Sequence, residues 1–419
     1  MQPAANAAKF DTPVAERFRS FGKSIFAEMT ALAAAHKAVN LSQGFPDFDG
    51  PPIAREAAIA ALNAGHSQYA RMIGVPALNQ AIARRWARAG RGEIDPEAHV
   101  TVTAGCSEAI GAALVGLLNP GDEVIIFEPY FDFYTACAAM AGAVPRVVTL
   151  HPPAAGGQAV GGRAVPAGSS SSAPAHFWFG ESQLRAAFTP RTRAIIINTP
   201  HNPTGKVFSR AELELIATLC QQHNVVAISD EVYEHLTFDA AQPHISIATL
   251  PGMWERTITL SSLGKTFSLT GWKVGWSIAP PALTACVRAA HQFMVFSGST
   301  PMQHGAIAVL DSGDEYIAGL KELYAANRDM LSDTLRQCGL TVFPSYSTYF
   351  LMADHTALGY ESDRAFCEHL TKSVGVAAIP PSVFYLTPGM GKELVRFAFC
   401  KKAETMREAC DRLKRGITR

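Results

Sequence analysis

One lysine lies in a stretch whose residue types could support carbonyl chemistry. Lys265 follows Ser262-Leu263-Gly264, directly after a predicted β-strand over residues 254–260. Glycine and small hydroxyl residues predict a tight turn in which the backbone can approach a ligand closely. Apolar and small neighbours would partly desolvate the ammonium, which lowers the pKa of a lysine and makes its amine a nucleophile. An enzyme that forms Schiff bases requires such a lysine, and Lys273 is a second cation that could hold a phosphate.

This stretch by itself leaves other interpretations open. A lysine in a glycine- and serine-rich loop is usually a solvated turn residue. Ser262-x-x-Lys265 also matches the nucleophile motif of penicillin-binding hydrolases. Those enzymes need a later Ser-Asp-Asn and Lys-Thr-Gly, and neither string occurs in the sequence. The other parts of the chain therefore have to decide between the three interpretations.

Further residues with suitable chemistry follow other predicted strands. These strands cover residues 100–103, 192–198 and 225–229. Just after them come Gly105–Ser107, Asn202, Asp230 and Tyr233. The glycine and hydroxyl residues of the first group precede a predicted helix, whose N-terminus could bind an anion. Because ligands bind beyond the carboxyl ends of the strands in parallel sheets, we expect these residues and Lys265 to share one site.

The elements that must position this site alternate between strand and helix. Continuous apolar strands alternating with helices predict an α/β fold with a mostly parallel sheet covered by helices on both faces. After residue 301 the pattern changes to long amphipathic helices over 303–338, short strands and a last helix over 403–415, which predicts a smaller α+β domain. The Ala/Gly/Ser/Pro tract at 152–175 predicts a flexible insertion. The predicted domains are an N-terminal arm and segment packing with the small domain (1–47), a large domain (48–300) and a small domain (301–419).

Composition excludes several classes of function. The 419 residues carry 36 Lys and Arg against 36 Asp and Glu, so no net basic field would attract nucleic acid. No apolar run approaches the length of a membrane-spanning helix, and the first ten residues lack a signal peptide's apolar core. The eight cysteines are scattered, which predicts reduced thiols and a cytoplasmic location. No clustered His and Cys spacing indicates a metal, so we expect none.

Four ordered motifs resemble a known family. The chain is similar to the class I/II aminotransferases, which are pyridoxal-phosphate enzymes with the aspartate-aminotransferase fold (fold type I). The resemblance spans about residues 25–413, and two stretches, Leu41–Phe48 and Thr266–Lys273, look most like the kynurenine/glutamine/methionine aminotransferase branch. The four motifs are Asn202-Pro203-Thr204-Gly205, Asp230-Glu231-Val232-Tyr233, Ser262-x-x-Lys265 with Gly271-Trp272-Lys273-Val274-Gly275, and Val395-Arg396-Phe397.

The resemblance implies a role for each cofactor-side residue. Lys265 would hold pyridoxal 5'-phosphate as a Schiff base and then shuttle a proton between the substrate Cα and the cofactor. Asp230 would pair with the protonated pyridine nitrogen, while Tyr233 and Asn202 would bond the ring's 3′ oxygen and Phe131 would stack on the ring. The phosphate would be bound by Gly105, Cys106, Ser107, Ser262 and Lys273, and by Tyr69 from a neighbouring subunit. A homodimer with shared active sites follows.

On the substrate side, the resemblance implies that Arg396 grips the substrate α-carboxylate through a bidentate fork. Asn202 and the Gly44 backbone would assist, and Phe26 would line the side-chain pocket. No Arg or Lys occurs from residue 289 to 320, where relatives specific for dicarboxylates carry an arginine. We therefore expect transamination between a neutral or aromatic L-amino acid, such as methionine, glutamine, an aromatic amino acid or kynurenine, and a 2-oxo acid, with ping-pong kinetics.

Two competing functions remain open from the sequence. A β-lyase of cysteine conjugates would use the same cofactor and would release pyruvate and ammonia without a 2-oxo acid. A non-catalytic pyridoxal-phosphate-binding module, as in some transcription regulators, would need an attached basic helix-turn-helix, and residues 1–45 are too short and too neutral for one.

Overall fold

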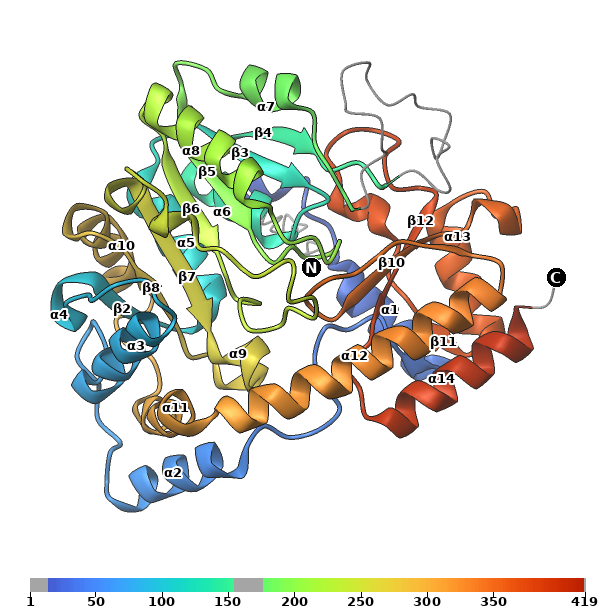
Figure 1. Cartoon of the computed structure of the whole chain (residues 1–419), viewed down its shortest axis with the longest axis horizontal. Helices are drawn as coiled ribbons and strands as arrows, with labels where there is room; N and C mark the ends of the chain where they lie inside the picture. The colour runs from blue at the N-terminus through green and yellow to red at the C-terminus, as the bar shows by residue number, and fades with distance from the viewer. Residues whose placement is uncertain (1–13, 154–175, 418–419) are drawn as a thin grey trace, which may run out of the picture.

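A computed structural model of the chain describes residues 14–153 and 176–417. One part of the fold is built on a large sheet and the other on the C-terminal elements (Figure 1). The long helix α12 (Asp314–Gln337) runs from the region of the large sheet to the C-terminal part. The predicted insertion at 152–175 lies outside the described residues, apart from its first two positions.

The described residues form a large sheet of seven strands in the order β2-β8-β7-β6-β5-β3-β4. All neighbouring pairs are parallel except those made by β8, which is antiparallel to both β2 and β7. This confirms the predicted mostly parallel α/β sheet. Its strands are β2 (Val100–Thr103), β3 (Glu123–Glu128), β4 (Val144–Thr149), β5 (Thr192–Asn198), β6 (Val226–Asp230), β7 (Thr257–Ser262) and β8 (Gly275–Ile278).

Helices cover both faces of this sheet because its central strands are apolar on both sides. Ile126 and Ile196 pack in a core with α5 (Gly105–Leu117), α6 (Phe133–Ala141) and α10 (Pro281–Met294). Their neighbours Ile125 and Ile195 point to the opposite face, where they pack in a second core with α7 (Glu181–Ala187) and α8 (Arg210–His223). A capping box between Ser209 and Glu212 fixes the start of α8.

The strand predicted over 254–260 needs one correction. Trp254–Arg256 forms a 3-10 turn, and β7 begins only at Thr257. The Thr257 hydroxyl and the Arg256 N–H both bond the carbonyl oxygen of Met253, which closes the turn before the strand starts. As a result β7 extends through Ser262, directly to the lysine.

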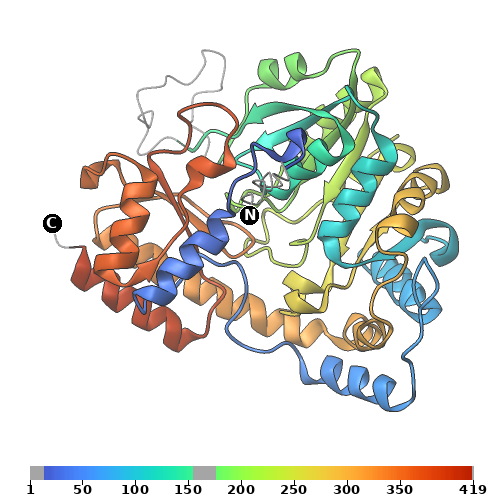
Figure 2. The same cartoon turned by 180° about the vertical axis from the view of Figure 1, so that it is seen from behind.

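The C-terminal part combines short strands with helices. Strand β10 (Phe350–Asp354) lies antiparallel between β9 (Thr341–Val342) and β12 (Leu394–Ala398). The N-terminal strand β1 (Val39–Asn40) pairs in parallel with β11 (Val376–Ala377). Helices α1 (Ile25–Ala35), α13 (Asp363–His369) and α14 (Ala403–Gly416) pack around these strands, and α1 lies against the C-terminal elements (Figure 2). The segment around residues 25–41 therefore joins the C-terminal core.

Further helices lie beside the large sheet. Helix α11 (Thr300–Ser312) packs against α2 (Pro52–Asn63) and α3 (Pro76–Arg88). The domain boundary expected at residue 300 stays a prediction. The short helix α4 (Pro96–His99) precedes β2, and the single-turn helix α9 (Leu263–Thr266) follows β7. Among the described residues, no helix combines the length and apolar character needed to cross a membrane.

Candidate active site

A cavity of about 290 Å³ opens at the carboxyl ends of β2, β5, β6 and β7. It receives residues from the large sheet, from the segment after β1 and from β12 of the C-terminal part. All the predicted site residues except Tyr69 line it, namely Phe26, Gly44, Gly105, Cys106, Ser107, Phe131, Asn202, Asp230, Tyr233, Ser262, Lys265, Lys273 and Arg396.

Lys265 lies on the single turn of helix α9, at the position where the sequence predicts a tight turn. The Ser262 hydroxyl caps this turn by accepting the Gly264 N–H at 3.3 Å. The Lys265 ammonium donates to the Gly44 carbonyl at 3.1 Å and faces the rings of Tyr233 and Tyr349. Burial lowers the pKa of Lys265 to about 8, so a substantial fraction of the amine is neutral near physiological pH. This environment suits a nucleophilic amine and does not suit a solvated turn lysine.

Asp230 ends β6 with its carboxylate facing the cavity, and it is only 3% exposed. Its Oδ2 accepts the Tyr134 hydroxyl at 2.6 Å, and its Oδ1 accepts the Val232 N–H at 3.2 Å and the Cys106 thiol at 3.5 Å. Burial raises the pKa of Asp230 despite these donors. A buried carboxylate in this position favours a cationic ligand group, such as a protonated pyridine nitrogen.

Two polar residues of this wall were not predicted. Tyr134 stands in an aromatic-rich run that reads as ordinary core, and only its hydroxyl on Asp230 reveals its part. Asn198 ends β5, where its Oδ1 accepts the Asn202 N–H at 2.7 Å and its Nδ2 donates to the Asp230 carbonyl at 3.0 Å. Its place at a strand end was the signal that could have identified it.

The start of α5 forms a cradle for an anion. Gly105 has φ +79°, and a Cβ there would lie 3.3 Å from Nζ of Lys273. At Gly275 a Cβ would come within 2.7 Å of the Cys106 nitrogen, so a glycine is needed for β8 to approach α5 this closely. The first residues of α5, Ser262 and Lys273 all line the cavity, and the Lys273 side chain lies next to the start of α5. Free N–H groups with a nearby cation fit a phosphate group.

Arg396 lies on β12 and is 1% exposed. Its guanidinium donates to Asn202 Oδ1 at 3.3 Å and to the Ser42 carbonyl at 2.9 Å, while its buried Nε has no partner. Burial lowers the pKa of Arg396 to about 10. No carboxylate forms an ion pair with it among residues 14–153 and 176–417. The rings of Phe26, Phe350 and Phe384 surround it at 4.3–5.3 Å. A buried cation with an unpaired donor is suited to an anionic ligand.

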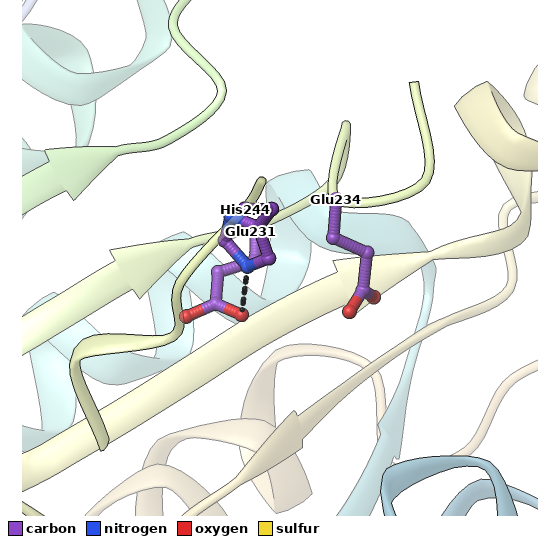
Figure 3. Close-up of side chains that lie close together, drawn as sticks. All are labelled: Glu231, Glu234 and His244. Carbon is purple, nitrogen blue, oxygen red and sulfur yellow. Dashed lines mark hydrogen bonds and ion pairs between the residues drawn. The ribbon is translucent and has the colours of Figure 1, made fainter. Parts of the chain in front are cut away.

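The segment from Asp230 to Glu234 has a second, buried face behind the cavity. There the side chains of Glu231, Glu234 and His244 bring atoms that could bind a metal ion, two carboxylate oxygens and an imidazole nitrogen, within 4.8 Å of one another. His244 Nε2 lies 2.8 Å from the Glu231 carboxylate (Figure 3). The Arg91 guanidinium lies 3.2 Å from Glu231 and 2.7 Å from Glu234. Burial opposes ionisation of Glu234, yet Arg91 holds the pKa of this carboxyl at about 2. With a guanidinium on both carboxylates, the cluster is an ion-pair network that fixes the segment carrying Asp230 and Tyr233.

Tyr69 lies apart from the cavity. Its side chain is 83% exposed and contacts Phe296 edge to face, with ring centroids 5.6 Å apart. Within one chain the structure therefore does not bring Tyr69 to the other predicted cofactor residues.

Comparison with known proteins gives consistent results. The family profile of "Aminotransferase class I and II" matches residues 36–413. A probable N-succinyldiaminopimelate aminotransferase of Mycobacterium tuberculosis is 45% identical over 95% of this chain and 97% of its own length. The methionine aminotransferase of Escherichia coli is 39% identical over 94% of this chain and 96% of its own length.

Solved structures agree. The structure of N-succinyldiaminopimelate aminotransferase from Mycobacterium tuberculosis superposes with a TM-score of 0.89, at 44% identity over 97% of this chain and all of that one. A methionine aminotransferase from Escherichia coli gives a TM-score of 0.88 at 38% identity, again over 97% of this chain and all of the other. With the lysine, the buried carboxylate and the anion cradle in one cavity, the chain belongs to the class I and II aminotransferases, which depend on pyridoxal phosphate.

Proposed function

We propose that this aminotransferase acts on neutral or aromatic L-amino acids, with a 2-oxo acid as the acceptor of the amino group. The observation that carries the proposal is the small number of cationic side chains in the cavity wall. Lys265, Lys273 and Arg396 are the cations that line it among the described residues. Since the two lysines lie on the cofactor side, Arg396 remains for a single substrate carboxylate.

The residues present fit the cofactor. Pyridoxal phosphate, when bound, supplies an electron sink that stabilises negative charge developing at the substrate Cα. In this proposal the α5 N-terminus, Ser107, Ser262 and Lys273 hold the phosphate, and Asp230 holds the pyridine nitrogen. Tyr233 and Asn202 hold the ring oxygen, and Phe131 packs on the ring.

Lys265 then acts as the proton carrier. Because its pKa is lowered to about 8, the neutral amine can accept the proton that leaves the substrate Cα and later return it. Arg396 orients the substrate by its α-carboxylate, so that the Cα–H bond faces the lysine. Phe26, Phe131 and Phe350 line the cavity and exclude water from the reacting atoms.

A second candidate substrate is suggested by the relative in Mycobacterium tuberculosis, which is named a probable N-succinyldiaminopimelate aminotransferase. N-succinyldiaminopimelate is a longer amino acid with additional carboxylates. Such a donor would need a further cation, and residues 14–153 and 176–417 of one chain offer no fourth one in the cavity wall. The cavity's aromatic lining favours the neutral donor instead.

A panel of amino donors tests the choice, with 2-oxoglutarate as acceptor. The donors are L-methionine, L-phenylalanine, L-glutamine, L-aspartate and N-succinyl-LL-diaminopimelate. We expect kcat/KM for methionine or phenylalanine to exceed that for aspartate by about a hundredfold, because an unpaired carboxylate in the cavity is costly. Highest activity with the succinylated donor would replace the proposal by the second candidate. Pyruvate release from a cysteine conjugate without a 2-oxo acid would indicate the β-lyase.

We further propose a homodimer in which Tyr69 reaches the partner's cofactor phosphate. Tyr69 is 83% exposed, its ring neighbour Phe296 is 45% exposed and Phe293, in the last turn of α10 just before Phe296, is 87% exposed. Such exposure is unusual for aromatic side chains of an isolated chain. Light scattering should give twice the chain mass, and Tyr69→Phe should weaken cofactor binding. Eight free cysteines in the described residues support a cytoplasmic location as part of the same proposal.

A further inference from the structure

The segment from Ser42 to Asp47 contains the backbone carbonyl that contacts Lys265, and it forms no helix or strand. Its Gly44 carbonyl accepts bonds from the Lys265 ammonium and from the Tyr349 hydroxyl. A Cβ at Gly44 would lie 2.7 Å from the ring of Phe350, so any larger residue at this position would have to displace that ring. We call residues 42–47 the Gly44 loop. Because Gln43, Gly44 and Phe45 all line the cavity beside Arg396, the loop's position shapes the space left for substrate.

Lys401, just beyond β12, holds this loop through backbone carbonyls. Its ammonium donates to the Phe45 carbonyl at 2.6 Å and lies 3.5 Å from the Gln43 carbonyl, so it spans the two residues on either side of Gly44. The Phe45 ring covers the ammonium, with its centroid 4.9 Å from Nζ. These contacts place one cation on both flanks of the residue that faces Lys265.

The surroundings of Lys401 distinguish it from an ordinary surface lysine. Its side chain is only 4% exposed, and no carboxylate forms an ion pair with it in the part of the chain that the structure describes. Burying an ammonium is costly unless its donors are used. Here the ammonium donates to two carbonyl oxygens of the loop. The cost of burying the charge is thus offset by contacts that fix the loop. Lys401 does not line the cavity and would act through the loop.

A second anchor ties the other end of the same loop to the C-terminal part. Asp47 accepts the Lys402 N–H at 2.7 Å and the Thr405 hydroxyl at 2.6 Å. Arg396 holds the start of the loop through the Ser42 carbonyl at 2.9 Å. Arg396 and the loop beside it are therefore held in one unit, although more than 340 residues separate them in the chain.

We propose that Lys401 is a positioning residue for the amino donor, because it fixes the Gly44 loop relative to Arg396 and Lys265. The proposal rests on the proposed function in taking the Arg396 side of the cavity as the substrate side. Lys401→Met keeps the length of the side chain and removes the ammonium. Lys402→Met is the matched control, since that side chain is exposed and its backbone N–H is retained.

The test uses the holoenzyme and follows the visible absorption of the cofactor as the amino donor is added. For Lys401→Met we expect an unchanged starting spectrum, a dissociation constant for L-methionine raised about tenfold, and a limiting rate within about twofold of the wild type. Lys402→Met should match the wild type in all three. If Lys401 only stabilised the fold, Lys401→Met would lower the limiting rate or release cofactor, and the effect would not be confined to the dissociation constant.

Hydrogen exchange in peptides covering residues 42–47 tests the loop without any reaction. We expect exchange about tenfold faster in Lys401→Met than in Lys402→Met. Equal exchange in the two variants would overturn the proposal about Lys401. If no amino donor reacts with the wild type, the proposed function is wrong, but the exchange experiment still tests the role of Lys401. Should Lys401→Met fail to fold, Lys401→Gln decides, because it removes the charge from the same position and keeps a polar side chain there. It should raise the same dissociation constant, and a wild-type value there would overturn the proposal.

Discussion

The two sides of the cavity are built differently. On the large sheet, Asp230 and Lys265 follow directly from strands β6 and β7 that are hydrogen-bonded to each other, so their spacing is set by the sheet. On the opposite side, Arg396 and Gly44 come from distant parts of the chain and are joined by side-chain contacts to backbone carbonyls. The proposed cofactor side thus takes its geometry from the sheet's backbone hydrogen bonds, whereas the proposed substrate side takes it from a few charged side chains. Substitutions on the two sides should therefore change different properties of the enzyme.

Removing the lysine should give the largest effect, and it should abolish chemistry on the cofactor side. We expect Lys265→Ala to lower kcat by at least about 10⁴-fold, since the proposed proton carrier is lost. The visible cofactor band of the wild type should disappear as well. Retention of substantial activity by Lys265→Ala would show that another base does the work.

Breaking the substrate side should leave the cofactor in place. We expect Arg396→Met to lower kcat/KM for L-methionine about 10²–10³-fold, because a buried carboxylate would lose its charged partner. The visible spectrum before substrate addition should stay that of the wild type. A changed spectrum would mean that the two sides are not separable.

The buried network behind Asp230 should matter chiefly for stability. Arg91→Met leaves Glu231 and Glu234 without their guanidinium, in a region where Glu231 is fully buried. Loss of one partner of a buried ion pair costs about 3–5 kcal/mol in the free energy of unfolding, which urea denaturation would measure. The exposed pair Arg336–Asp333 is the matched control, and Arg336→Met should change stability by less than about 1 kcal/mol. Equal effects of the two substitutions would refute the assignment.

The smallest effect concerns the pH dependence of the lysine in cofactor-free enzyme. Burial lowers the pKa of Lys265 to about 8, so the neutral amine forms as the pH rises through 8, well before an ordinary lysine deprotonates. Modification of Lys265 by an amine-reactive reagent, followed by peptide mass spectrometry, should show a midpoint near pH 8. A midpoint in the range of an ordinary lysine would contradict the desolvated environment.

This contrast also explains what could be predicted. Strand-end residues such as Asp230, Asn202 and Lys265 could be grouped from sequence, since the carboxyl ends of parallel strands meet at one edge. Arg396 and Gly44 could be assigned only through the family resemblance, because no local pattern relates residue 44 to residue 396. Lys401 escaped because two adjacent lysines look alike in sequence, although one is buried and the other exposed. Tyr134 escaped because a buried tyrosine and a core aromatic have the same pattern, and only its partner distinguishes them.

The parallel pairing of β1 with β11 has a consequence for synthesis of the chain. Val39 pairs with Val376, so the N-terminal strand must wait for nearly the whole chain before its partner exists. The strands of the large sheet are complete by residue 278, which lets the cofactor side assemble while translation continues. A ribosome-bound chain stopped before residue 376 should hold a formed sheet beside an unpaired N-terminal segment. The two halves of the catalytic cavity thus become available in sequence, and substrate recognition is the last to mature.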